Sequence, residues 1–90
     1  MNVVGKTPDG KVVVSGLFMM HDTMGLPLAD IFSLSAEKNL QPSFPHFYDE
    51  AIEAGWRHKT IILRLREALA DSHGSDYANV VCDRLEKMYA

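Results

Sequence analysis

The sequence lacks most of the residues that would mark a secreted, metal-binding or membrane-spanning protein. It has one cysteine, Cys82, which excludes an intramolecular disulfide and a multi-cysteine zinc site. Its longest nearly uncharged stretch, residues 12–21, is too short to cross a bilayer and contains polar residues. Met1 is not followed by the charged and apolar segments of a signal peptide. We therefore expect a cytoplasmic protein without a membrane partner, in which Cys82 is a small, partly buried hydrophobic residue.

The sequence also lacks the spacing that metal-binding or catalytic residues require. No two of its four histidines lie three or four residues apart on one predicted helix, and no His-Glu-x-x-His motif is present. Gly5, Gly10 and Gly16 are spaced as turn and strand residues, which excludes a glycine-rich phosphate loop. His21 and Asp22 are adjacent in sequence, so their side chains point apart and do not form a catalytic dyad. We expect no metal site, no cofactor and no catalytic residue, and therefore a protein that is not an enzyme.

Charge is unevenly distributed in this chain. Among 90 residues, 47% are apolar and 23% are charged, which is typical of a single globular domain, here residues 1–90. The net charge of −3 argues against a protein whose whole surface binds nucleic acid. Residues 1–50 hold three basic and six acidic residues, whereas residues 57–66 hold four lysine and arginine residues and no acid. This basic run is the first candidate for a contact surface.

Residues 1–20 predict a β-hairpin. β-Branched residues flank the sequence TPDG at 7–10, in which proline and glycine favour a tight turn. We expect the second arm to continue through residues 17–20. A lone two-stranded ribbon is marginally stable in water. The hairpin must therefore pack on the helices or pair its edge with another chain, and the second alternative makes a homodimer possible.

Residues 26–90 predict a helical bundle of about four short helices. Pro27 suits the first turn of one helix, Ser43 caps the next, and Ser75 starts the last. Gly55 and Gly74 are placed to end helices. The helix near residues 58–72 has an apolar stripe of Ile61, Ile62, Leu65, Ala68 and Leu69, and the last helix aligns Tyr77, Val81, Leu85 and Met88. The predicted fold class is therefore α+β, mostly α, with an N-terminal β-hairpin.

Small and apolar residues mark the corner at residues 44–72. Ala51 is a small residue in the first helix, an apolar–glycine–apolar turn follows, and Ile61 is an aliphatic residue of the second helix. Over residues 47–66, about a fifth of the chain, this arrangement resembles the helix-turn-helix motif of DNA-binding proteins. The sequence departs from that family at Glu50 and Arg64, where the family has apolar residues. The resemblance implies that the groove-facing residues are Arg57, His58, Lys59, Thr60 and Leu63.

Arg57, His58 and Lys59 stand at the start of the predicted helix, where positive charges oppose the helix dipole. Each such charge costs about 0.3–1 kcal/mol at an exposed site. Residues that break a local rule are candidates for function. Cations beside the free backbone amides of a helix start bind anions, either phosphate or the carboxylates of a partner. In the alternative arrangement, the helix begins at Thr60, which caps it, and the three basic residues lie in the loop.

Leu63 points almost opposite the apolar stripe of its helix, alongside Lys59 and Arg66. We expect it to pack against the hairpin or the first helix; in the alternative, it is the centre of a small contact patch. The leading hypothesis is a small non-enzymatic regulatory or adaptor protein that contacts a protein partner through this basic helix surface. The alternative is a helix-turn-helix DNA-binding regulator. The predicted contact residues are Arg57, His58, Lys59, Thr60, Leu63, Arg64 and Arg66.

Overall fold

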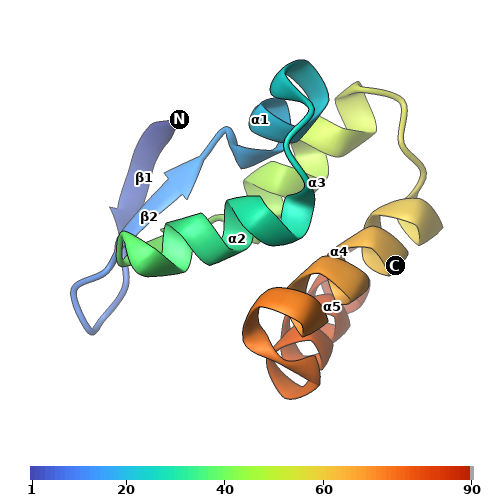
Figure 1. Cartoon of the computed structure of the whole chain (residues 1–90). Helices are drawn as coiled ribbons and strands as arrows, with labels where there is room; N and C mark the ends of the chain where they lie inside the picture. Colours follow the sequence, from blue (N-terminus) through green and yellow to red (C-terminus); the bar gives the residue numbers. More distant parts are fainter. Residues whose placement is uncertain (90) are drawn as a thin grey trace.

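The computed structural model describes residues 1–89 as a small three-stranded sheet with five helices (Figure 1). The elements follow one another as β1 (Asn2–Lys6), β2 (Val12–Ser15), α1 (Leu17–Met24), α2 (Leu28–Glu37), β3 (Leu40–Pro42), α3 (Phe44–Glu53), α4 (His58–His73) and α5 (Ser75–Tyr89). The fold is α+β and mostly α, as the sequence predicts. In Figure 1 the β1–β2 hairpin and the α4–α5 pair lie on opposite sides of the molecule, with α2 between them.

The predicted hairpin is confirmed, but its second arm is shorter than expected. Strands β1 and β2 pair antiparallel, and the backbone N–H of Gly10 closes the turn by donating to the carbonyl of Thr7 at 3.0 Å. The expected extension through residues 17–20 is wrong, because α1 begins at Leu17. Gly16 has a φ of 87°, which ends the strand. Leu17 and its neighbour Phe18 are both buried, and a helix, unlike a strand, places adjacent residues on one buried face.

Two elements were not predicted from the sequence, helix α1 and strand β3. Strand β3 pairs parallel with β2, so that Val12 faces Leu40 and Val14 faces Pro42. The strand order is β1-β2-β3, which makes β2 the central strand and leaves one edge of β1 open within residues 1–89. All five residues of β1 are exposed. With α1 added, residues 1–89 contain five helices, where about four were expected.

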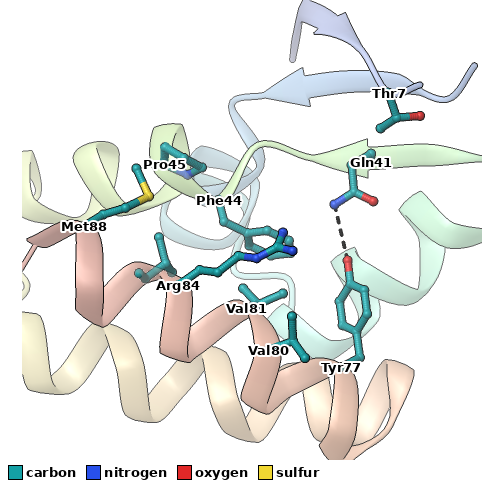
Figure 2. Close-up of a pocket in the computed structure, with 10 residues that line it drawn as sticks. Thr7, Gln41, Phe44, Pro45, Tyr77, Val80, Val81, Arg84 and Met88 are labelled. Carbon is teal, nitrogen blue, oxygen red and sulfur yellow. Dashed lines mark hydrogen bonds between the residues drawn. The ribbon is translucent and has the colours of Figure 1, made fainter. Parts of the chain in front are cut away.

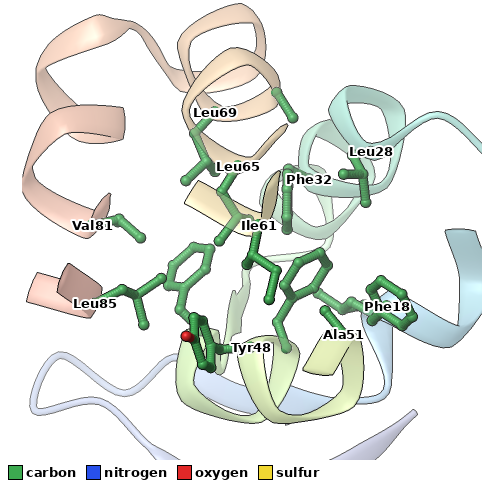
Figure 3. Packing of buried hydrophobic residues seen from close by; sticks show 14 of the residues in the cluster. Phe18, Leu28, Phe32, Tyr48, Ala51, Ile61, Leu65, Leu69, Val81 and Leu85 are labelled. Carbon is green, nitrogen blue, oxygen red and sulfur yellow. The ribbon is translucent and has the colours of Figure 1, made fainter. Parts of the chain in front are cut away.

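Helix α4 forms the centre of the core (Figure 3). Its predicted apolar stripe is confirmed: the buried residues are Ile61, Ile62, Leu65, Ala68 and Leu69. The helix packs against α2 on one side and α5 on the other. Around it, the ring of Phe47 lies edge-on to Phe18 at 5.3 Å and tilted against Phe32 at 5.8 Å. Each large apolar side chain buried in this way stabilises the fold by about 1.5–3 kcal/mol.

The turn between α3 and α4 confirms that Gly55 ends its helix. Gly55 has a φ of 96°, its N–H donates to the carbonyl of Ile52 at 3.0 Å, and the N–H of Trp56 donates to the carbonyl of Ala51 at 2.9 Å. This pair of hydrogen bonds is the Schellman arrangement that terminates helices at glycine. The indole of Trp56 then packs edge-on against Phe18 at 5.1 Å. The turn therefore sets the direction in which the chain enters α4.

We predict that Gly55→Ala lowers the free energy of unfolding by about 1–2 kcal/mol, because a left-handed backbone is unfavourable for a residue with a Cβ. The cost is conformational, since an added Cβ meets no atom within 4 Å. The matched control is Gly5→Ala, which also has open space but no positive φ, and it leaves stability unchanged or slightly raises it. Urea unfolding of the two variants is the measurement, and equal effects would contradict the assignment.

Candidate interaction surface

Helix α4 begins at His58, with Arg57 in the cap position, so the alternative start at Thr60 is wrong. The basic residues therefore occupy the start of the helix. Lys59 and Thr60 are exposed on its outer side. Leu63 is 59% exposed, and the expectation that it packs against the hairpin or first helix is wrong. The reason is that α4 buries its stripe against α2 and α5, which leaves no element of residues 1–89 over its outer face.

Arg64 is turned sideways, away from that outer face and toward Trp56. Its guanidinium carbon lies 5.6 Å from the centroid of the Trp56 ring, in a cation–π interaction. The same indole ring also lies edge-on to His21, whose Nδ1 is 2.7 Å from the carbonyl oxygen of Leu26. Arg64 thus stands where the helix-turn-helix family has an apolar residue because its side chain covers Trp56. It is part of the fold of the corner.

Arg66 is turned the other way, toward α5. Its Nη1 donates a hydrogen bond to the side-chain oxygen of Asn79, and its Nη2 lies 3.9 Å from a carboxylate oxygen of Asp83. The side chains of Arg66 and Asp83 are 36% and 66% exposed, so the attraction between their charges stabilises the fold only slightly. The pairing nevertheless occupies the guanidinium group. Arg66 is therefore a bridge between α4 and α5.

His58 faces inward. Its Nδ1 lies 2.7 Å from the hydroxyl oxygen of Tyr48 on α3, and Tyr89 of α5 stacks on Tyr48 at 3.8 Å. Burial, followed by the charge of Asp49, raises the pKa of Tyr89. Its hydroxyl donates a hydrogen bond to the carbonyl oxygen of Pro45 at 3.4 Å. These contacts tie the start of α4 to α3 and α5, which is a structural task for His58.

Four of the seven predicted contact residues remain together on an open face: Arg57, Lys59, Thr60 and Leu63, named here the α4 surface. Neither Arg57 nor Lys59 forms a salt bridge with another side chain of residues 1–89. The first turn of α4 contains no acid, and no side chain caps its backbone amides. Further along the same outer side, Glu67 is exposed four residues after Leu63. The outer side of α4 is therefore positive at its start and negative toward its end.

A second feature, an apolar groove, was missed at the sequence level. It lies between α5 and the segment where β3 leads into α3, and its volume is about 490 Å³ (Figure 2). The sequence placed Met88 on the buried face of the last helix, but it is 59% exposed at the rim of this groove. Val80 lies on the same side of α5 and is 52% exposed. The spacing of Val80, Arg84 and Met88, four residues apart, was the available signal.

Other kinds of functional site were sought in the same residues. Residues 1–89 hold no cluster of three or more His, Cys, Asp or Glu side chains that could bind a metal ion. Of the helices in the same residues, none has both the length and the apolar character needed to cross a membrane.

Comparisons of the chain with protein-family models, curated proteins and solved structures find no match. The proposed function therefore rests on the two surfaces of this chain.

Cys82 is fully buried, where partial burial was expected. Its Sγ lies 3.7 Å from the carbonyl oxygen of Ile62, at the contact between α5 and α4. Burial raises the pKa of the thiol, which lowers the fraction of reactive thiolate at neutral pH. The side chain therefore acts as a small apolar residue of the core.

We predict that a thiol reagent modifies Cys82 at least about 100-fold more slowly in native protein than in denaturant, since reaction requires opening of the α4–α5 contact at a free energy of about 3 kcal/mol or more. The control is the double variant Cys82→Ala/Val80→Cys, which carries its thiol at an exposed position of the same helix. It reacts at nearly the same rate with and without denaturant. Fast stoichiometric labelling of native Cys82 would show that the contact is open in solution.

Proposed function

We propose that the protein is a small, non-enzymatic regulatory or adaptor protein that binds an acidic, partly apolar segment of a partner protein through the α4 surface. The observations that carry this proposal are the 59% exposure of Leu63, which lies one helical turn after Lys59, and the absence of a salt-bridge partner within residues 1–89 for Lys59 and for Arg57 at the cap of the same helix. A leucine supplies the apolar contact, and the cations select the charge of the partner. The other two arginines of residues 57–66, Arg64 and Arg66, contact Trp56 and Asn79 of the same chain.

The start of α4 adds a second attraction for carboxylates. Its first backbone N–H groups have no side-chain cap, and the positive end of the helix dipole lies there. A carboxylate that approaches Arg57 and Lys59 also meets these amides, so each hydrogen bond is charge-assisted. The unfavourable placement of cations at a helix start is relieved when an anion binds. This accounts for the basic residues at a position where they weaken the isolated helix.

DNA binding through the helix-turn-helix corner is the second candidate. It is favoured by the corner itself, in which Ala51 and Ile61 are both 0% exposed and the first helix is terminated at Gly55. Against it, Glu67 is exposed four residues after Leu63, on the side of α4 that would enter the groove, and it would repel phosphate. The cations available for phosphate contacts on this helix are Arg57 and Lys59, since Arg64 contacts Trp56. A protein partner therefore fits the α4 surface better.

We predict that the double variant Arg57→Glu/Lys59→Glu loses its partner while the fold survives, because both side chains are exposed. A photo-crosslinking residue placed at Thr60 reports the contact, and mass spectrometry of the adduct identifies an acidic segment. The control is Lys6→Glu/Lys38→Glu, which changes the net charge equally at two exposed positions outside α4. It keeps the adduct. Loss of the adduct in both double variants, or in neither, excludes the α4 surface.

A titration of a labelled DNA duplex at low salt separates the two candidates in the same samples. If Arg57 and Lys59 contacted phosphates, the logarithm of the affinity would fall against the logarithm of the salt concentration with a slope of about −2. We expect no saturable binding. Saturable binding with that slope, abolished by Arg57→Glu/Lys59→Glu, would establish the DNA-binding alternative.

The open edge of β1 is the pairing site that the fold offers for a homodimer. The strand is exposed along its whole length, and Val3 is 69% exposed. We predict a solution mass near twice 10.1 kDa for the wild-type chain and a monomer for Val3→Lys, because a lysine on an edge strand opposes pairing with a second strand. The control is Met24→Lys, which places the same charge at a 67% exposed position outside the sheet. A wild-type mass of 10.1 kDa would exclude the dimer.

A further inference from the structure

The groove beside α5 has a floor that belongs to the core. Phe44 is 8% exposed, and its ring contacts the rings of Phe32 and Tyr77 at centroid distances of 5.9 Å and 6.4 Å. Val81 and Leu85, which also line the groove, are 8% and 2% exposed. Because these residues are held by packing on their inner sides, the groove is formed before any partner binds, as ligand sites commonly are.

The rim of the groove alternates apolar and positive along α5. Val80 and Met88 are 52% and 59% exposed, and they are separated by eight residues, or about 12 Å of helix. Arg84 lies midway between them, and its guanidinium group points toward the middle of the groove (Figure 2). It is the single charged residue of the lining. It forms no salt bridge with a side chain of residues 1–89.

At the far end of the groove, the polar side chains already form hydrogen bonds within the fold. There the side-chain amide of Gln41 donates hydrogen bonds to the hydroxyl oxygen of Tyr77 and to the carbonyl oxygen of Pro42, both at 3.3 Å. The dashed line in Figure 2 marks the first of these bonds. The groups that a partner has to complement are therefore those of the rim. They are Val80, Arg84 and Met88, which present an apolar side chain, a positive charge and a second apolar side chain at equal spacing.

This spacing favours a helix as the occupant. A compact ligand placed at Arg84 would not reach both Val80 and Met88, which lie about 12 Å apart along α5. A helix with an acidic residue between two aliphatic residues, each four positions away, repeats the spacing of α5 and complements its charge. A second copy of α5 fits poorly, because a two-fold contact centred on Arg84 brings two guanidinium groups together. The partner is therefore a different helix.

We propose that the groove between α5 and the β3–α3 segment binds an amphipathic helix of a partner protein, with an acidic residue facing Arg84 and aliphatic residues covering Val80 and Met88. This site is separate from the α4 surface, since no residue that lines it belongs to α4. In Figure 2 helix α4 lies on the side of α5 opposite the groove. Two separate sites let one small chain hold two proteins at once, as an adaptor does.

A synthetic peptide tests the groove without knowledge of the natural partner. The probe is a fluorescent, alanine-rich helical peptide of about 16 residues that carries leucine, glutamate and leucine at four-residue spacing; its pair has lysine in place of glutamate. We expect saturable binding of the glutamate peptide to the wild-type chain. Arg84→Glu weakens that binding at least about tenfold and makes the lysine peptide the tighter ligand. The matched control, Lys87→Glu, changes the same charge on α5 at a residue outside the groove lining and leaves both affinities unchanged.

Methyl NMR spectra locate the peptide. The methyl signals of Val80, Leu85 and Met88 shift on binding, and those of Leu63 do not. The variant Arg57→Glu/Lys59→Glu still binds the peptide, so failure of the α4 surface and failure of the groove are distinguished. The proposal is overturned by absence of saturable binding, by equal effects of Arg84→Glu and Lys87→Glu, or by shifts at Leu63 in place of the groove residues.

Discussion

The burial of one aliphatic stripe, on α4, is the constraint on which the rest of the structure depends. Because the helix packs against both α2 and α5, its rotation about its own axis is fixed. That rotation places Leu63 opposite the core, and it turns Arg64 toward Trp56 and Arg66 toward α5. The Schellman turn at Gly55 sets where the helix starts. Both the shape of the open α4 surface and its short extent follow from this packing.

The arginines of the chain fall into two groups, those held by contacts within the fold and those free to contact a partner. A guanidinium group that stacks on an indole or bonds an amide is held by the fold, whereas one that meets only water is free for a partner. Arg64 and Arg66 belong to the first kind and Arg57 and Arg84 to the second, within residues 1–89. Arg84 lies between the exposed Val80 and Met88 of α5, and Arg57 lies at the start of the helix that carries the exposed Leu63. An apolar contact flanked by a cation is a common chemistry for recognition of acidic amphipathic segments, and this chain presents it twice.

The sequence by itself determined the features that depend on neighbours in the chain. The turn at residues 7–10, the stripe of α4 and the ends of helices at Gly55 and Gly74 are all visible in it, because turn conformation, helical period and positive φ are local properties. The sequence also marked Glu50 as a departure from the helix-turn-helix pattern. The reason for a polar residue at this position lies in the tertiary structure. The Glu50 carboxylate accepts a hydrogen bond from the backbone N–H of Gly16 at 3.2 Å, where α1 begins.

Only the tertiary structure decided the features that depend on distant residues. Strand β3 is three residues long and exists because β2 lies beside it, so no local period could reveal it. Residues 17–20 form a helix whose adjacent side chains Leu17 and Phe18 are both buried, at the contact of α1 with α2 and α3. The groove beside α5 arises where Phe44 approaches Val81 and Leu85 from another part of the chain. Helical spacing shows which residues share a face, but the packing of the other elements selects which face is covered and which meets a partner.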